Sequence, residues 1–311
     1  MKLCFIGLGS IGSRHLNNII AILKERNIPH SIDALRSSKS KKQERIREIL
    51  HKEYYSFEDM PNDYDIIYIT NPTYMHYETI EQIKHKTKHI FIEKPLFESC
   101  NYKLNNLNLQ DSNIYYVACP LRYSPVIKYV KKIIQEKKVY SVRAISSSYL
   151  PDWRKGADYR NIYSAKKQEG GGVSLDLIHE WDYIIDLLGI PLQVYNLSGQ
   201  YSTLEIDSDD ISIYIAKYAD KLVELHLDYF GRKQMRQLEL FCEDGVIFAD
   251  IINSKVEIYS EKCETIILNH EDIYMNEMNH FLDMIVGKET NINSIYHAYQ
   301  VLKTALGEED E

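Results

Sequence analysis

The feature that most constrains this chain is a glycine-rich turn close to its start. The sequence GLGSIG at residues 7–12 follows a short apolar run and precedes an amphipathic stretch. In such a turn one glycine permits a tight reversal, a second lets backbone approach a pyrophosphate, and a third lets helix and strand pack closely. The helix N-terminus adds unpaired N–H groups and the positive end of its dipole. The motif therefore predicts a dinucleotide site at Gly7, Gly9, Ser10, Ile11 and Gly12.

The pattern of apolar residues changes along the chain. The first third alternates short apolar runs, such as DIIYIT at 65–70, with amphipathic stretches, which is typical of βαβ units and a parallel sheet. After about residue 123, strand-like segments with short connections indicate a mostly antiparallel sheet. We therefore predict an α/β protein, with an N-terminal Rossmann doubly wound parallel sheet at 1–122 and a C-terminal α/β domain with a mostly antiparallel open sheet at 123–311.

Composition narrows the classes of function. At ~150 residues per domain, 311 residues suggest about two domains, and a net charge of −8 argues against a nucleic-acid partner. No apolar run approaches the ~18–20 residues needed to span a bilayer, and the start lacks the layout of a signal peptide. We therefore expect a cytoplasmic protein without a membrane partner. The five cysteines include no CxxC pair, so neither a disulfide framework nor a metal site is expected.

The end of the second predicted strand bears on the choice of dinucleotide. An acidic residue there binds the ribose 2′-hydroxyl of NAD, whereas an arginine accommodates the 2′-phosphate of NADP. Asp33 stands too early in the strand, and the tip carries Arg36, Ser37 and Ser38. The sequence therefore predicts an NAD(P) site that favours NADP. The alternative is an ordinary basic surface loop.

Further motifs follow in order along the chain. NPTYMH stands at 71–76, EKP at 93–95, LRYSP at 121–125, and GGG at 170–172 before an aspartate and a histidine. Together with GLGSIGSRH at 7–15, they resemble the Gfo/Idh/MocA oxidoreductases, which include glucose–fructose oxidoreductase and inositol dehydrogenase. The resemblance covers essentially the whole chain. It implies hydride transfer between a nicotinamide and a hydroxyl-bearing carbon of a sugar, sugar derivative or cyclitol, in a dimer or tetramer formed through the C-terminal sheet.

The resemblance also assigns roles to residues of the first domain. The lysine of EKP touches the substrate hydroxyl in such enzymes, and this role would fall on Lys94. Glu93 and Pro95 would fix that lysine near the nicotinamide ribose. The segment beside the cofactor would contribute Thr70, Asn71, Pro72, Thr73 and His76.

Oxidation of an alcohol requires a base for the hydroxyl proton, and histidine suits this task because its unperturbed pKa is ~6.5. We predict one helix over 173–188, in which Asp176 and Asp182 each lie three residues from His179 and share its face. The family's aspartate commonly precedes the histidine by four residues, so Asp176 departs from that spacing. Lys94 and His179 are the predicted catalytic pair, with Asp176 as a further candidate. A buried or capping histidine is the alternative.

A polar stretch at 150–160 mixes aromatic and charged residues. Aromatic faces stack on sugar rings, while arginines bind hydroxyl, phosphate or carboxylate groups. Three arginines, at 122, 154 and 160, suit the anionic group of an acid sugar or a nucleotide-linked sugar. The alternative is a surface excursion anchored by a tryptophan. The predicted substrate residues are Arg122, Tyr123, Trp153, Arg154, Tyr159, Arg160 and Asp182.

Two other functions fit the same fold. The first is a catalytically inactive, dinucleotide-responsive binding or regulatory protein, but such a protein needs neither Lys94 nor His179. The second is a reductase of an imine or a tetrapyrrole. The polar, arginine-rich stretch favours hydroxylated substrates over a flat apolar ligand.

Overall fold

The structure is a computed structural model that describes residues 1–37 and 48–308. The chain divides into two compact units. The N-terminal unit comprises the described residues of Met1–Phe97 together with Asn101–Ala118 and Tyr274–Tyr299. The C-terminal unit comprises Glu98–Cys100, Cys119–Ile273 and the described residues from Gln300 onward. The division of the chain into domains at residues 122 and 123 stays a prediction.

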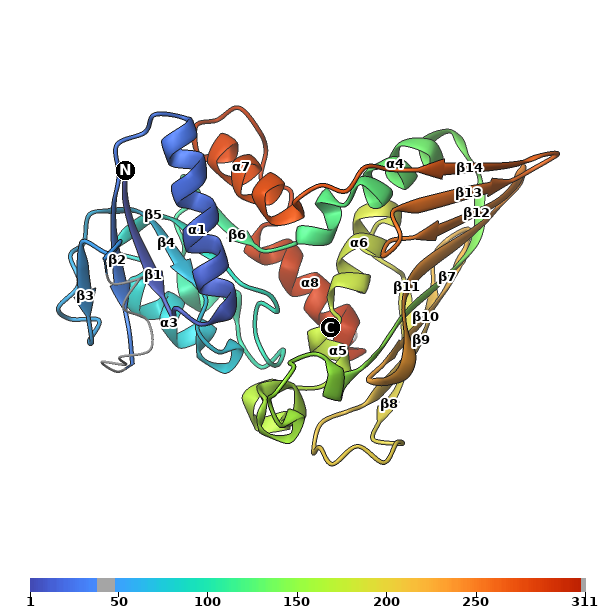
Figure 1. Cartoon of the computed structure of the whole chain (residues 1–311), viewed down its shortest axis with the longest axis horizontal. Coiled ribbons are helices and arrows are strands. Elements are labelled where there is room, and N and C mark those ends of the chain that lie inside the picture. Colours follow the sequence, from blue (N-terminus) through green and yellow to red (C-terminus); the bar gives the residue numbers. More distant parts are fainter. Residues whose placement is uncertain (38–47, 309–311) are drawn as a thin grey trace. The chain divides into compact units, whose positions relative to one another are not determined.

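The N-terminal unit contains a parallel sheet of six strands in the order β3-β2-β1-β4-β5-β6 (Figure 1). This is the doubly wound order, which reverses between β1 and β4 and places the carboxyl ends of those two strands side by side. Ile6 pairs with both Leu35 and Ile69 across these strands. The strands are β1 (Lys2–Ile6), β2 (Ser31–Leu35), β3 (Lys52–Tyr54), β4 (Tyr64–Ile69), β5 (Thr87–Ile92) and β6 (Tyr115–Val117).

Helices cover this sheet, and one of them comes from late in the sequence. α1 (Ser10–Glu25) and α3 (His76–Ile83) follow β1 and β4, whereas α7 (Ile273–Ile285) is more than 150 residues beyond β6 in the chain. Phe281 of α7 packs edge-on against Phe91 with ring centroids 5.2 Å apart. The Tyr116 hydroxyl donates to Glu277, 3.0 Å away. Buried aromatic rings therefore join α7 to the core of the N-terminal unit.

The C-terminal unit contains an eight-stranded sheet in the order β14-β13-β12-β11-β7-β10-β9-β8. Every neighbouring pair is antiparallel except β7 and β10, which are parallel. The predicted fold class, a parallel Rossmann sheet plus a mostly antiparallel open sheet, is confirmed. The strands are β7 (Val139–Tyr149), β8 (Gln193–Gly199), β9 (Ile211–Lys217), β10 (Leu222–Asp228), β11 (Phe230–Cys242), β12 (Gly245–Asp250), β13 (Lys255–Tyr259) and β14 (Cys263–Ile267).

The helices of this unit, α4 (Pro125–Ile133), α5 (Val173–Asp176) and α6 (His179–Leu188), lie on the same side of the sheet (Figure 1). α8 (Ile295–Leu306) completes the chain's helices in the described range. On the opposite side of the sheet, Tyr195 and Leu197 of β8 pair with Ile215 and Ile213 of β9. These side chains are 60% and 78% exposed in β8 and 43% and 40% exposed in β9. We call this patch the outer apolar face.

The prediction of one helix over 173–188 is wrong. α5 ends at Asp176, Leu177 takes φ −96° and ψ 24°, and α6 begins at His179. Asp176 and His179 therefore belong to different helices, and the shared-face argument holds only for His179 and Asp182. We attribute the break to contacts with distant segments, because hydrogen bonds with Asp209 and Tyr229 hold the two ends of α5.

The polar stretch before α5 folds into four short 3₁₀ turns. They are Leu150–Asp152, Tyr159–Asn161, Tyr163–Ala165 and Lys167–Glu169. In the described part of the chain, none of the helices combines the length and the apolarity needed to cross a membrane.

Candidate active site

The glycine-rich turn after β1 has the geometry that a dinucleotide site requires. Gly7 has φ +88°, and a Cβ on it would lie 2.8 Å from the Asn71 nitrogen. A Cβ on Gly12 would lie 2.4 Å from the Gly7 carbonyl oxygen, so this glycine lets α1 approach β1. Gly9 instead faces open space, with no described atom within 4 Å of its Cβ position. No side chain of the described residues caps α1 there, which leaves its first-turn N–H groups to a ligand.

The segment after β4 is fastened beside this turn. The Thr70 hydroxyl donates to the Ile6 carbonyl at 3.2 Å, and it also contacts the Gly7 carbonyl. Asn71 donates its amide to Thr79 at 2.9 Å. The Asn71 Oδ1 is buried and has no hydrogen-bond partner among the described residues, so it remains an acceptor for a ligand. The predicted residues of the two loops are thus brought together at the β1–β4 switch point.

His76 lies within α3, behind this segment. Its ring nitrogens lie 3.0 Å from the Asn71 carbonyl and 3.1 Å from the Leu96 carbonyl. Burial lowers the pKa of His76, although these backbone oxygens oppose the shift. Thr73 is buried and Pro72 exposed at the start of the short 3₁₀ turn that precedes α3. His76 therefore contacts both the loop after β4 and the backbone that directly follows the E-K-P segment.

The E-K-P segment follows β5, and its glutamate is buried. Glu93 contacts His15 Nε2 of α1 through Oε1, and its Oε2 accepts the backbone N–H of Lys94 at 3.2 Å. Burial raises the pKa of Glu93, but the hydrogen bond from His15 and the charges nearby outweigh it and hold that pKa below its usual value. Lys94 is half-buried, and its bond to Pro95 is cis. His15 ends the GLGSIGSRH motif, but the motif does not indicate what this histidine contacts.

The end of β2 differs from a simple phosphate site. Arg36 is 9% exposed, and its guanidinium pairs with the Glu53 carboxylate of β3 at 2.7 Å. Asp33 is buried and accepts the Tyr64 hydroxyl at 2.8 Å, so it is held within the sheet. Ser37 is exposed, and Ser38 lies outside the described residues. Glu53 could not be predicted as the partner of Arg36, because β3 is only three residues long.

In the C-terminal unit, the triple glycine packs against a carboxylate from a distant loop. Gly172 has φ +120°, and a Cβ on it would lie 2.0 Å from Asp209 Oδ1. Asp209 Oδ2 accepts the Ser174 backbone N–H at 3.0 Å and its hydroxyl at 2.7 Å. Burial raises the pKa of Asp209, although the bonds from Ser174 oppose the rise. Asp209 thus fixes the first turn of α5, and only glycine fits opposite it.

The other end of α5 is held by two phenols. Asp176 is 4% exposed and accepts hydrogen bonds from Tyr163 and from Tyr229, the latter at 2.6 Å. Burial, and then the charge of Asp176, raises the pKa of Tyr229 well above its usual value. Trp153 stands edge-on to the Tyr229 ring at 5.2 Å, and its indole donates to Ser148 at 3.0 Å. A hydrogen bond and a ring contact, both made by Tyr229, therefore link Asp176 to Trp153 of the predicted substrate loop.

His179 is the first residue of α6 and is partly exposed. Asp182, one turn later, binds Arg122 in a bidentate ion pair with distances of 2.7 and 2.9 Å. Both of these residues are 6% exposed. Burial lowers the pKa of Arg122, but the charge of Asp182 outweighs it and holds the pKa above its usual value. Arg122 and Asp182 thus bind each other, while Tyr123 is buried beside them.

Of the remaining substrate candidates, Tyr159 and Arg160 lie on a 3₁₀ turn, whereas Arg154 lies in the segment before it. Arg160 binds Asp158 at 2.8 Å and Glu205 at 3.0 Å, and the Tyr159 hydroxyl accepts the Glu205 N–H at 3.2 Å. Arg154 is exposed and forms no ion pair with any described residue. Of the three arginines proposed to hold an anion, only Arg154 lacks an acidic partner in the described structure.

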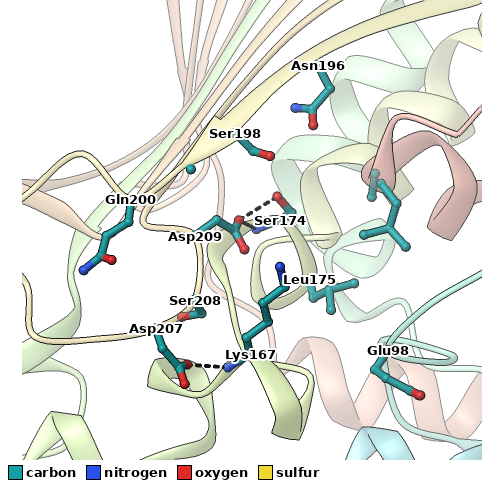
Figure 2. A pocket seen from close by; sticks show the side chains of 14 residues that line it. Glu98, Lys167, Ser174, Leu175, Asn196, Ser198, Gln200, Asp207, Ser208 and Asp209 are labelled. Atoms are coloured by element: carbon teal, nitrogen blue, oxygen red, sulfur yellow. Dashed lines mark hydrogen bonds between the residues drawn. The ribbon is translucent and has the colours of Figure 1, made fainter.

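A polar pocket of about 460 Å³ opens in the C-terminal unit, beside α5 and the end of β8 (Figure 2). In Figure 2 the Asp209 carboxylate is bonded to Ser174, and Asp207 accepts the Lys167 N–H at 2.7 Å. The lining offers both donors and acceptors, which suits a hydroxylated ligand. Sequence reasoning gave no signal for it, because its polar residues come from separate loops. It is lined by Glu98, Lys167, Gly171, Ser174, Leu175, Asn196, Ser198, Gly199, Gln200, Asp207, Ser208, Asp209, Ala305 and Leu306.

Two family models match this chain, one in its N-terminal part and one in its C-terminal part. Residues 1–117 match the model of an oxidoreductase family with an NAD-binding Rossmann fold, and residues 127–248 match the GFO/IDH/MocA C-terminal domain. The chain belongs to the GFO/IDH/MocA oxidoreductase family. The family model describes residues 1–117 as an NAD-binding Rossmann fold, and the glycine-rich turn lies within this range. The predicted family is confirmed.

Curated relatives match part of the chain. An uncharacterized oxidoreductase of Bacillus subtilis (strain 168), YrbE, is 26% identical over 195 residues, which are 59% of this chain and 52% of that protein. A D-xylose dehydrogenase of Paenarthrobacter nicotinovorans is 24% identical over 144 residues, which are 45% of this chain and 37% of that protein. The match thus spans about half of the first relative and less of the second.

Solved structures share the fold over nearly the whole chain. Levoglucosan dehydrogenase in complex with NADH and levoglucosan has a TM-score of 0.84 at 16% identity, covering 99% of this chain and 95% of that one. UDP-N-acetylglucosamine 3-dehydrogenase from Acidithiobacillus ferrooxidans has a TM-score of 0.75 at 19% identity, covering 98% of this chain and 95% of that one. At these identities the likeness shows the fold alone.

Proposed function

We propose that this protein is an NAD(P)-dependent dehydrogenase or reductase that acts on a hydroxyl-bearing carbon of a sugar, a sugar derivative or a cyclitol. The observation that carries the proposal is the pairing of an open glycine turn with a lysine whose backbone is bonded to a buried glutamate. Gly9 leaves the N-terminus of α1 open, and Glu93 accepts the Lys94 N–H. When bound, the dinucleotide supplies the hydride acceptor or donor.

The residues present in the N-terminal unit fit a dinucleotide. Gly9, Ser10 and Ile11 would hold the pyrophosphate through first-turn N–H groups, because no side chain of the described residues caps that turn. The buried Asn71 Oδ1 would accept a hydrogen bond from the ligand. A Cβ at Gly7 or Gly12 would collide with backbone, so both glycines are needed for the cradle.

Two side chains are proposed to manage the proton. Lys94 would hold the substrate hydroxyl through its ammonium group, and His179 would take or return the hydroxyl proton. Asp176 already accepts two phenolic O–H groups. We therefore assign Asp176 to positioning Tyr229, and through it Trp153, rather than to proton transfer.

The substrate is proposed to be hydroxylated and to carry an anionic group, as an acid sugar or a nucleotide-linked sugar does. Arg154 is the strongest candidate to bind that group, because its charge has no acidic partner in the described structure. Trp153, 37% exposed, offers an aromatic face to a sugar ring. Sugar-type substrates in the names of the relatives and of structurally similar proteins support this class.

Two finer points complete the proposal. We propose that the protein prefers NADP to NAD, because Arg36 stands at the end of β2. The Arg36–Glu53 ion pair opposes this preference, since Glu53 already neutralises the charge of Arg36. We also propose a homo-oligomer, a dimer or tetramer, formed through the outer apolar face. Four large apolar side chains at 40–78% exposure form a patch of the kind that marks interaction surfaces.

The decisive experiment is an assay of dinucleotide-dependent turnover with a panel of sugars, acid sugars and nucleotide-linked sugars. Lys94→Ala is expected to lower kcat at least ~100-fold with the protein still folded. Lys132→Ala is the matched control, since Lys132 is exposed on α4. Turnover that is unaffected by Lys94→Ala would refute this mechanism. Tight dinucleotide binding without turnover would instead favour a regulatory protein, and turnover of imines or tetrapyrroles alone would favour the other alternative.

A further inference from the structure

A buried polar contact joins α1 to the E-K-P segment in the N-terminal unit. His15 is fully buried and Glu93 is 8% exposed, and they meet through Nε2 and Oε1. The second oxygen of Glu93 accepts the Lys94 N–H at 3.2 Å. The glutamate thus uses one oxygen for α1 and the other for the backbone of the lysine proposed to act on substrate.

The surroundings of His15 indicate which of its ring nitrogens donates a hydrogen bond. Nδ1 is buried without a hydrogen-bond partner among the described residues. The ring is packed edge-on against Phe91 at 5.0 Å and Tyr274 at 6.1 Å. Glu93 as a carboxylate has no hydrogen to donate, so the proton lies on Nε2 and His15 is the donor. The contact has one direction, from His15 to Glu93.

Stability alone does not explain this buried pair. A buried carboxylate destabilises the fold unless it is paired, and a well-packed apolar pair is often at least as stable. What the carboxylate adds is a fixed acceptor for the Lys94 N–H, which an apolar side chain cannot provide. The cost is therefore explained if the position of Lys94 matters.

We propose that His15 is a positioning residue for Lys94, acting through Glu93. The inference rests on the proposed function of Lys94. His15 fixes the rotamer of Glu93, Glu93 fixes the backbone of Lys94, and the ammonium group is thereby presented at one place. A displacement of about 1 Å in a catalytic group costs up to ~100-fold in rate.

The charged groups around Glu93 give the pair a pH signature. His15 of α1, Lys94 beside it and His76 of α3 all act to lower the pKa of Glu93, while burial acts to raise it. Glu93 in turn raises the pKa of Tyr274 of α7. Without the His15 donor, one of the groups that lower this pKa is lost, so the pKa of Glu93 rises relative to the wild type and the carboxylate takes up a proton at higher pH.

Three variants separate positioning from packing. His15→Phe keeps a ring of similar size and removes the donor, whereas His15→Gln keeps an N–H donor. Glu93→Gln keeps the shape, but it replaces one of the two acceptor oxygens with an NH2 donor, so only one of the contacts with His15 and Lys94 retains an acceptor. His30→Phe is the matched control, since His30 lies in the same unit and contacts only the Ile28 carbonyl, at 2.9 Å, among the described residues.

The first readout is kcat against pH. His15→Phe is expected to lower kcat about 10- to 100-fold, with a steeper loss toward pH 6 than the wild type shows. His15→Gln should restore most of the rate and the wild-type profile. Glu93→Gln should lower kcat without the additional acid loss. A uniform decrease in His15→Phe that His15→Gln does not repair would show a packing role and overturn the proposal.

The second readout needs neither dinucleotide nor substrate. Acetylation of the Lys94 amine by acetic anhydride at pH 8 is followed by peptide mass spectrometry, with Lys132 as the internal reference. Lys94 is expected to react several-fold faster in His15→Phe and in Glu93→Gln, and at the wild-type rate in His15→Gln and His30→Phe. Wild-type labelling of Lys94 in Glu93→Gln would overturn the proposal even if His15→Phe failed to fold.

The two readouts also keep this inference apart from the proposed function. A wild-type protein that turns over no member of the panel would refute the function, while the labelling would still decide whether His15 positions Lys94. A protein that turns over a sugar with equal rates in the wild type and His15→Phe at every pH would retain the function and refute the positioning.

Discussion

The two units build their candidate sites in different ways. In the N-terminal unit the predicted pyrophosphate site is made mainly of backbone: glycines that permit close approach, and a helix N-terminus without a side-chain cap in the described structure. In the C-terminal unit it is made of side chains from distant segments, as in the contacts of Asp209 with Ser174 and of Tyr229 with Asp176. A backbone site leaves its mark as a local motif, whereas a side-chain network leaves almost none.

The largest expected effect tests the backbone site. Gly9→Ala adds a methyl group where no described atom lies within 4 Å, so the fold should tolerate it while pyrophosphate approach is blocked. The loss of one or two charge-assisted hydrogen bonds corresponds to about 10- to 100-fold weaker dinucleotide binding. Titration of protein fluorescence with NADH and NADPH measures the change, and a thermal melt checks stability.

Gly12→Ala is the matched variant, and we expect it to reduce the stability of the fold as well as dinucleotide binding. Its Cβ would lie 2.4 Å from the Gly7 carbonyl oxygen, and overpacking of this kind costs about 1–3 kcal/mol of unfolding free energy. We expect a lower melting temperature together with weaker binding. If Gly9→Ala destabilises the protein as much as Gly12→Ala does, the second glycine is structural, and the assignment of its open side to the ligand is wrong.

The C-terminal unit offers a pH test of its side-chain network. Burial raises the pKa of Asp209. An aspartate in the unfolded chain ionises near pH ~3.9, so above that pH the unfolded state loses its proton first. Folding stability is therefore lost as the pH rises through the higher folded value. Asp209→Asn removes this loss but forfeits the charged acceptor of Ser174.

Urea unfolding at several pH values between about 4 and 7 separates these contributions. The destabilisation caused by Asp209→Asn should be largest near pH 4 and should shrink as the pH rises. Asp207→Asn is the control, because Asp207 is exposed and accepts only a backbone N–H in the described structure. A destabilisation that is constant across this range would mean that Asp209 ionises alike in the folded and unfolded states.

The same contrast explains how far the sequence could be interpreted. The order of elements, the glycine turn and the E-K-P segment could be predicted because each is contiguous in the chain. The break between α5 and α6 could not, because it depends on Asp209 and Tyr229, which are 33 and 53 residues away from Asp176. The acidic partners of Arg122 and Arg160 could not be predicted either. The sequence shows that an arginine is charged, but not that a carboxylate already binds it.

A smaller effect concerns the choice of dinucleotide. Glu53→Gln removes the carboxylate that pairs with Arg36 at 2.7 Å and leaves its charge to a 2′-phosphate. A hydrogen bond of about 1 kcal/mol corresponds to roughly a fivefold increase in the preference for NADP over NAD. The ratio of the two kcat/KM values measures it, with exposed Glu58→Gln as the control. An unchanged ratio would show that Arg36 does not determine the choice between NADP and NAD.

The smallest effects distinguish the two exposed arginines of the substrate loop. Arg154→Ala should raise KM for an anionic sugar several-fold, because this charge is not matched by an acid in the described structure. Arg160→Ala should change KM by less than about twofold, since Asp158 and Glu205 already neutralise it. A neutral sugar from the same panel is the control, and neither variant should affect its KM. Equal effects of the two variants would mean that the ion pairs of Arg160 open when substrate binds, and that charge pairing in the unliganded protein does not identify the residues that bind an anion.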